Sequence, residues 1–137
     1  MNRDELQRLS EDRIEDAKAL LAAERWSAAF YMSGYSIECA LKACVAKQIK
    51  QYDFPDKAFL SDLYIHDLSK LLKKAGLEKE RQAKEVGSPS FKNFWKVVSS
   101  WSEQSRYESR SEAEARDLLL AIGHDEEGVL SWVKQHW

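Results

Sequence analysis

Hydrophobic residues recur along this 137-residue chain mostly at three- and four-residue spacings, which is the period of an α-helix. The segment from Arg25 to Lys50 differs from the rest because it is apolar or small almost all the way round. Since such a helix is covered on every side, we expect it in the middle of a bundle. One polar stripe runs along it, within about 60° on a helical projection. The stripe consists of Tyr31, Tyr35, Glu38 and Lys42.

Other segments predict amphipathic helices that bury one face each. Residues 3–24 form the first, and a shorter helix begins near His66 with Gly76 as its stop. We expect a long connection at residues 53–65, where a proline disfavours helical geometry for the residue before it. The charged residues 77–86 predict a further helical turn or two.

The last third of the chain carries a loop signal and three more helical runs. Residues 87–90, Gly-Ser-Pro-Ser, predict a loop. A helix with an aromatic face follows, marked by Phe91, Phe94, Trp95, Val98 and Trp101. Ser111 and Glu114 form a capping box before a run that Gly123 breaks or kinks. In the final helix we expect the acidic residues 125–127 in the first turn, where the helix dipole favours them.

These segments predict an all-α fold, an up-and-down bundle of four long helices plus one or two short ones. The length fits a single domain over residues 1–137. Five glycines and two prolines leave few of the turns that a β-sandwich needs. The net charge of -2 gives no overall attraction to nucleic acid or to anionic membrane, so any such binding requires a local patch.

The two cysteines, Cys39 and Cys44, lie five residues apart in one predicted helix, too far apart for a disulfide. We interpret them as small buried hydrophobic residues and poor nucleophiles, because an apolar environment raises a thiol pKa. The chain has no signal-peptide pattern and no run of 18 apolar residues, so we expect a cytoplasmic protein without a membrane span.

Few residues could carry chemistry. The three histidines, His66, His124 and His136, lie far apart and outside any zinc motif, so we predict no metal and no cofactor. The polar stripe is either a solvent-facing strip, with Glu38 and Lys42 as an ordinary ion pair, or the lining of a cleft or dimer interface. Tyrosine suits the second role because it offers apolar area and a hydroxyl together.

Two further positions have alternative interpretations. His66 is either a residue at a helix start or core edge, or the beginning of a phosphate-binding patch, since residues 66–84 carry an excess of positive charge. Arg106, followed by Tyr107, lies where a new element must begin after the aromatic helix. An arginine there either caps helix carbonyls or binds phosphate with two hydrogen bonds.

The sequence resembles the HEPN domain, a small helical module found in prokaryotes and higher eukaryotes. The resemblance spans nearly the whole chain, and its most specific part is a Gly-x-x-x-Glu-x-x-Leu-Lys-Ala core at residues 34–43. The other matching positions are residues 16–21, Arg25-Trp26, Tyr31, His66-Asp67-Leu68, Leu71-Leu72, Arg106-Tyr107 and Trp132-Val133.

The resemblance implies a helical bundle, often a homodimer, and often encoded beside a minimal nucleotidyltransferase in a toxin-antitoxin or defence module. It also implies that many active members are metal-independent ribonucleases. Their motif is an arginine followed after four to six residues by a histidine, and both contribute to a cleft across the dimer. The arginine holds phosphate, and the histidine assists attack by the 2′-hydroxyl.

This chain departs from that motif. Seven residues separate Arg116 from His124, and neither Arg106 nor Arg110 has a histidine at the required distance. Catalysis would therefore require side chains distant in the sequence to converge on one phosphate. The catalytic candidates are His66, Arg106, Arg116 and His124.

The leading prediction is a homodimeric HEPN-like module that binds a nucleotide, an RNA or a partner protein without cleavage, with a minimal nucleotidyltransferase as one candidate partner. An atypical HEPN endoribonuclease toxin and a non-catalytic dimeric scaffold subunit are the alternatives. The predicted ligand-binding or interface residues are Tyr31, Tyr35, Glu38, Lys42, His66, Arg106 and Tyr107.

Overall fold

The structure is a computed structural model, and it describes residues 1–49, 61 and 64–137. Within these ranges the chain forms helices and no strand, which confirms the predicted all-α bundle. The helices are α1 (Arg3–Ala22), α2 (Trp26–Lys47), α4 (Leu68–Lys74), α5 (Glu78–Gly87), α6 (Pro89–Ser99), the 3-10 helix η1 (Glu103–Tyr107), α7 (Glu112–Gly123) and α8 (Val129–Lys134).

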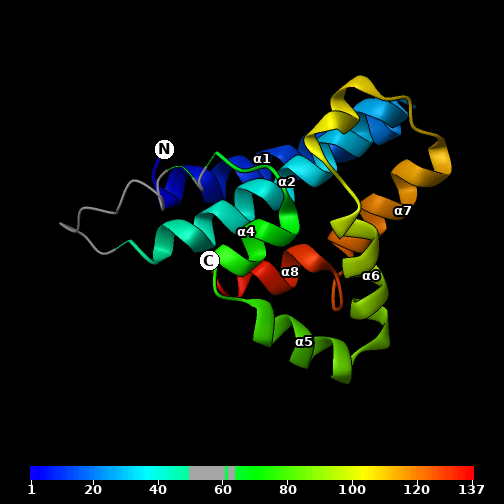
Figure 1. The fold of residues 1–137 in the computed structure, drawn as a ribbon. Coiled ribbons are helices and arrows are strands. Elements are labelled where there is room, and N and C mark those ends of the chain that lie inside the picture. Colours follow the sequence, from blue (N-terminus) through cyan, green and yellow to red (C-terminus); the bar gives the residue numbers. More distant parts are fainter. Residues whose placement is uncertain (50–60, 62–63) are drawn as a thin grey trace.

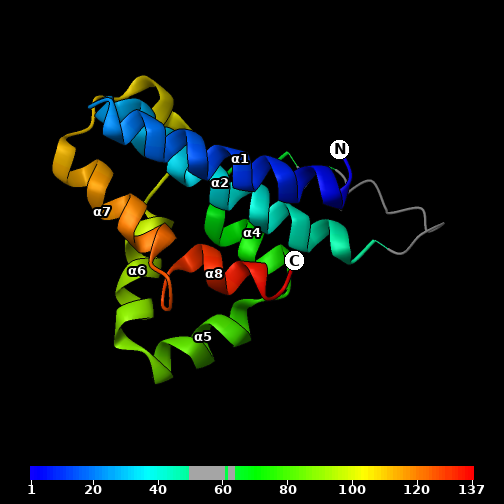
Figure 2. The same cartoon turned by 180° about the vertical axis from the view of Figure 1, so that it is seen from behind.

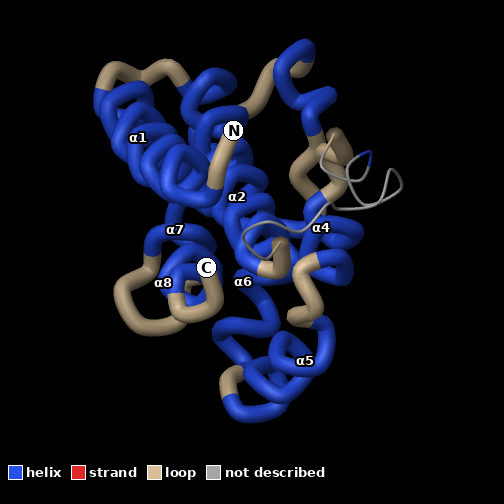
Figure 3. The backbone as a smooth tube through the Cα atoms, turned by 90° about the vertical axis from the view of Figure 1, so that its left-hand side faces the viewer, coloured by secondary structure: helices blue, strands red, loops and turns tan. Residues whose placement is uncertain are grey.

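Helix α2 lies at the centre of the bundle, as its apolar pattern predicts. Helix α1 runs along one side of it, and α4, α7 and α8 contact it from other sides (Figures 1 and 2). Two serines let α1 and α2 approach closely. Ser10 Oγ donates to the Ser36 carbonyl at 2.8 Å, and Ser36 Oγ donates to the Ser10 carbonyl at 2.8 Å. Helix α5 lies at the edge of the bundle far from α1 (Figure 3).

Gly34 on α2 is required for the packing of the segment that follows α6. A Cβ at Gly34 would lie 2.2–2.3 Å from three atoms of the Trp101 ring, which is too close for any real contact. The indole of Trp101, only 2% exposed, therefore packs directly on the α2 backbone. This contact brings the beginning of η1 to the side of α2.

The predicted loop at residues 87–90 is wrong. Gly87 ends α5, and Ser88 is already the N-cap of α6, where its Oγ accepts from the Phe91 N–H at 3.1 Å. Pro89 occupies the first turn of α6, where its missing N–H leaves no bond unmade. The same break separates α6 from α5, which is a ten-residue helix rather than a turn or two.

Two other expectations concern connections. Residues 125–127 do not lie in the first turn of α8, which begins at Val129 after Gly128. They form the turn between α7 and α8, where Glu127 accepts a hydrogen bond from Ser88 Oγ at 2.6 Å. That bond and the nearby Lys84 ammonium lower the pKa of Glu127. The predicted connection at residues 53–65 lies mostly outside the described residues.

The expected ends of α4 and α7 are confirmed. Asp67 caps α4, and Gly76, with φ +74°, adopts the left-handed conformation just beyond its end. Ser111 and Glu114 form the predicted capping box, and α7 ends at Gly123. No helix in the described part of the chain is long and apolar enough to cross a membrane.

Candidate functional site

The polar stripe of α2 is buried at Glu38 and half-buried at its other positions. Glu38 is 2% exposed, and its carboxylate lies 3.3 Å from Lys42 Nζ and 3.0 Å from His66 Nδ1. Because Glu38 is buried and the Lys42 side chain is only 15% exposed, the interpretation of the stripe as a solvent-facing strip is wrong.

His66 links this buried carboxylate to η1. Its Nε2 lies 3.2 Å from Glu103 Oε2, and the other oxygen of Glu103 accepts from Arg106 Nη2 at 2.6 Å. One polar network therefore joins three separate parts of the sequence. It runs from Glu38 through His66 to the pair of Glu103 and Arg106.

The tyrosines of the stripe pack beside this network. The rings of Tyr31 and Tyr35 stack with centroids 6.0 Å apart, and Tyr31 also lies 5.8 Å from Trp101. The Arg106 guanidinium lies 5.9 Å from the Tyr31 centroid and 5.3 Å from that of Tyr107. Burial raises the pKa of Tyr31 and of Tyr35, so both remain protonated hydrogen-bond donors at neutral pH.

A pocket of about 630 Å³ opens beside these side chains, and we call it the arginine pocket. It lies between the start of α2 and the segment from η1 to α7, and its lining includes three arginines and two large aromatic residues. Its lining residues are Glu24, Arg25, Trp26, Ser27, Ala28, Tyr31, Met32, Ser105, Arg106 and Arg110. Arg25 forms no ion pair with any residue that the structure describes.

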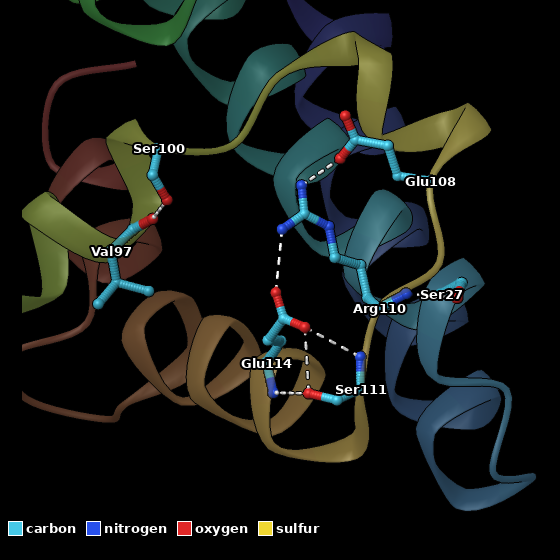
Figure 4. A network of polar contacts seen from close by, with 7 residues as sticks. All are labelled: Ser27, Val97, Ser100, Glu108, Arg110, Ser111 and Glu114. Carbon is cyan, nitrogen blue, oxygen red and sulfur yellow. Dashed lines mark hydrogen bonds and ion pairs between the residues drawn. The ribbon is translucent and has the colours of Figure 1, made fainter.

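Figure 4 shows how Arg110 is fixed in the wall of this pocket. Its Nη1 donates to Glu114 at 3.0 Å, its Nη2 donates to Glu108, and its backbone N–H donates to Ser27 Oγ at 2.9 Å. The guanidinium also lies 4.4 Å from the Phe30 centroid. The hydrogen bond to Glu114 raises the pKa of Arg110.

A second pocket, of about 760 Å³, lies between α1 and α7, and we call it the leucine pocket. Its lining residues are Lys18, Leu21, Arg116, Asp117, Leu119, Leu120, Gly123, His124, Asp125 and Glu126. Arg116 and His124, which come nearest to the ribonuclease spacing, both belong to it. Three carboxylates and two cations make its ionic lining net negative.

Arg116 and His124 each have local partners. Arg116 Nε donates to Glu112 at 2.7 Å, and its guanidinium lies 5.4 Å from the Trp26 centroid. His124 Nδ1 accepts the backbone N–H groups of Glu126, at 3.3 Å, and Glu127, at 2.9 Å. Its single ring proton therefore resides on Nε2.

The four catalytic candidates thus fall into two groups. His66 and Arg106 both contact Glu103, whereas Arg116 and His124 both line the leucine pocket. The seven predicted ligand-binding or interface residues lie together around α2 and η1, but of these only Tyr31 and Arg106 line the arginine pocket.

Sequence reasoning missed Arg25, Trp26, Ser27, Glu103, Ser105 and Arg110 as site residues. The spacings of Glu103 to Arg106 and of Arg110 to Glu114 are visible signals of local ion pairs. The hydrogen bond from Arg110 to Ser27 joins residues 83 positions apart, and no local pattern indicates it.

The remaining candidate groups are accounted for by their surroundings. Cys39 and Cys44 are free and buried, and burial raises the pKa of each thiol to about 11, which makes both poor nucleophiles. In the basic segment, Arg81 pairs with Glu85 and Lys84 pairs with Glu127. Among the described residues, no cluster of three His, Cys, Asp or Glu side chains is arranged to hold a metal ion.

These features define a class of protein, a small all-α module with an arginine-rich pocket beside its central helix. The model of the HEPN domain family matches residues 4–136, and the chain therefore belongs to that family. No curated protein and no solved structure gives a significant match to the chain.

Proposed function

We propose that this HEPN domain binds a nucleotide, free or within single-stranded RNA, in the arginine pocket and does not cleave it. The observation that carries the proposal is the combination of Arg25, Arg106 and Arg110 with the rings of Trp26 and Tyr31 in one pocket.

Arginine recognises phosphate with parallel hydrogen bonds, and aromatic rings stack on unpaired bases, each stack contributing about 1–3 kcal/mol. Arg106 and Arg110 each donate to carboxylates through some of their five N–H groups, which orients the guanidinium groups and offsets their positive charge. Arg25 has no such partner among the described residues, so its guanidinium is not already engaged by a carboxylate there.

Ser105 adds a hydrogen-bonding group to the pocket. The residue is 1% exposed, and its Oγ has no hydrogen-bond partner in the described part of the chain. A buried hydroxyl without a partner is unfavourable, and a polar atom of a bound ligand can relieve that cost. This hydroxyl supports a polar ligand rather than a purely apolar one.

The absence of cleavage is supported by how the histidines are placed. None lines the arginine pocket among the residues described, and His66 has a carboxylate at each ring nitrogen. The leucine pocket does contain Arg116 and His124, but its excess of carboxylates disfavours a phosphodiester there.

The test measures the affinity of two charge-reversal variants of the protein for a short fluorescent single-stranded RNA at one fixed, low salt concentration. We expect Arg25→Glu to weaken binding by about tenfold or more, because it removes a charged hydrogen bond and adds a repulsive carboxylate. The matched control Lys18→Glu, in the leucine pocket, should change the affinity less than twofold.

The RNA should remain intact without metal. Metal-independent cleavage that Arg116→Ala abolishes in a folded protein would contradict the proposal, as would equal losses in the two charge reversals.

We also propose that the leucine pocket is the contact surface of a homodimer. Leu21, Leu119 and Leu120 are surrounded there by charges of both signs, and the Leu120 side chain is 54% exposed. A surface with both signs can complement itself across a two-fold axis. A nucleotidyltransferase partner and a toxin-antitoxin role rest on the family resemblance and stay predictions.

A further inference from the structure

We propose that His66 is a positioning residue for the arginine pocket. Held by the buried Glu38, it orients Glu103, and Glu103 in turn fixes the guanidinium of Arg106. The effect on ligand affinity rests on the function proposed above, whereas the effect on Arg106 itself does not.

The anchor of this arrangement is rigid. Glu38 lies near the middle of α2 and is 2% exposed, and Lys42 holds its second oxygen. The backbone of His66 comes just before α4, whose N-cap Asp67 accepts the Lys70 N–H at 2.9 Å. Helix α2 and the start of α4 therefore fix the position of the imidazole independently of η1.

Helix η1, which His66 contacts through Glu103, has little stability of its own. Helix η1 is a 3-10 helix of five residues, and its N-cap Ser102 makes no side-chain capping bond. Such short helices have poor hydrogen-bond geometry, so tertiary contacts decide where they lie. Trp101, packed on Gly34, and the buried Ser105 hold parts of this segment, and Glu103 provides its bond to His66.

Glu103 transmits the constraint because its two oxygens are parts of one planar group. Oε2 lies 3.2 Å from His66 Nε2, and Oε1 accepts from Arg106 Nη2 at 2.6 Å. With Oε2 held, Oε1 points in a fixed direction, and the half-exposed Arg106 is kept over Tyr31. Without His66, the carboxylate can rotate toward solvent, and Arg106 loses its preferred orientation.

A double-mutant cycle on RNA affinity separates positioning from a general structural role. We expect His66→Ala and Arg106→Ala each to weaken binding of the single-stranded RNA about fivefold. The double variant should bind as Arg106→Ala does, because His66 acts through Arg106. Partial recovery is expected for His66→Gln, whose amide can donate to Glu103. His136→Ala, which removes a histidine packed on Trp132, is the matched control and should leave the affinity unchanged. Additive losses in the double variant would overturn the inference.

A second measurement needs no ligand. Nitrogen-15 relaxation of the Arg106 Nε–Hε group should report an ordered side chain in the unmodified protein and a mobile one in His66→Ala. The same signal of Arg116, which is held by Glu112, should not change. If the unmodified protein fails to bind RNA, the proposed function fails, while this experiment still tests the positioning of Arg106. Unchanged Arg106 order in His66→Ala would overturn the inference.

Discussion

The two pockets of this domain are neighbours of similar size and opposite character. Trp26 lines the arginine pocket, and its ring is contacted by Arg116 of the leucine pocket. The arginine pocket has three guanidinium groups and one carboxylate in its lining, whereas the leucine pocket has two cations and three carboxylates. The residues nearest to a ribonuclease motif thus lie in the pocket less suited to an anion. Residue spacing alone does not show whether a pocket favours phosphate.

The pockets also differ in how the fold makes them. The leucine pocket is formed by two helices that the sequence pattern predicts, α1 and α7, and by the turn after α7, which the pattern assigned to the final helix. The arginine pocket depends on contacts between distant segments, such as Trp101 on Gly34 and Arg110 on Ser27. It should therefore be the more easily disturbed of the two by changes in packing.

The largest expected effect is that of Gly34→Ala, which acts behind the arginine pocket. The added methyl group would meet the Trp101 ring at 2.2 Å, so the ring or the helix must move. Overpacking of this kind costs about 1–3 kcal/mol or more, and we expect a loss near the upper end. Chemical denaturation measures the loss, and RNA affinity should fall as η1 shifts.

The matched control is Gly123→Ala in the leucine pocket, where an added Cβ meets nothing within 4 Å and φ is not positive. Replacing a helical glycine with alanine at such a position is neutral or stabilises by up to about 1 kcal/mol. Equal stability of the two variants would show that the close contact at Gly34 is not required.

A smaller effect on stability is expected for Leu120→Asp, which changes the leucine pocket. Because Leu120 is 54% exposed, the variant should fold with little loss of stability. The added carboxylate would be placed in the apolar contact of the proposed dimer, so we expect the variant to be monomeric at concentrations where the unmodified protein is expected to pair. Sedimentation velocity measures the dimer, and RNA affinity per subunit should stay within twofold. If Leu120→Asp left dimerisation unchanged, the leucine pocket would not be the dimer interface.

The smallest effect concerns acid stability behind the arginine pocket. The Ser111 backbone N–H and the Arg110 guanidinium lower the pKa of Glu114 from its ordinary value near 4.5. A carboxyl with a lowered folded-state pKa stabilises above its unfolded pKa, and this stabilisation is lost as pH falls through the folded value. Glu114→Gln should therefore be slightly less stable than the unmodified protein at pH 7, and the difference should shrink as the pH falls below about 4.5 and vanish once the pH lies below the lowered folded pKa of Glu114.

Glu126→Gln, at an exposed position in the leucine pocket, is the control for this titration. The Glu126 side chain has no hydrogen bond or ion pair to a described residue, so no difference is expected at pH 7. Thermal denaturation across this pH range measures the stability of each variant. If Glu114→Gln were less stable than the unmodified protein by the same amount at every pH, the lowered pKa of Glu114 would not be the cause.

Much of the fold follows from local patterns, since capping residues, apolar spacing and the all-round apolar character of α2 act within one helix. The break at residues 87–90 was harder to predict because the same residues that form loops also cap helices, as Ser88 and Pro89 do here. The sequence marks Glu38, His66 and Arg106 as separate candidates and does not predict that they form one network. Glu103, which joins the last two, depends on the placement of η1 beside α2.

The most direct test of the central claim is a chemical-shift titration of the nitrogen-15-labelled protein with the single-stranded RNA. We expect the largest changes at Arg25, Tyr31 and Ser105, with little change at Leu120 and Gly123, and we expect the RNA to remain uncut. Changes concentrated at Leu120 and Gly123, or cleavage of the RNA during the titration, would contradict that claim.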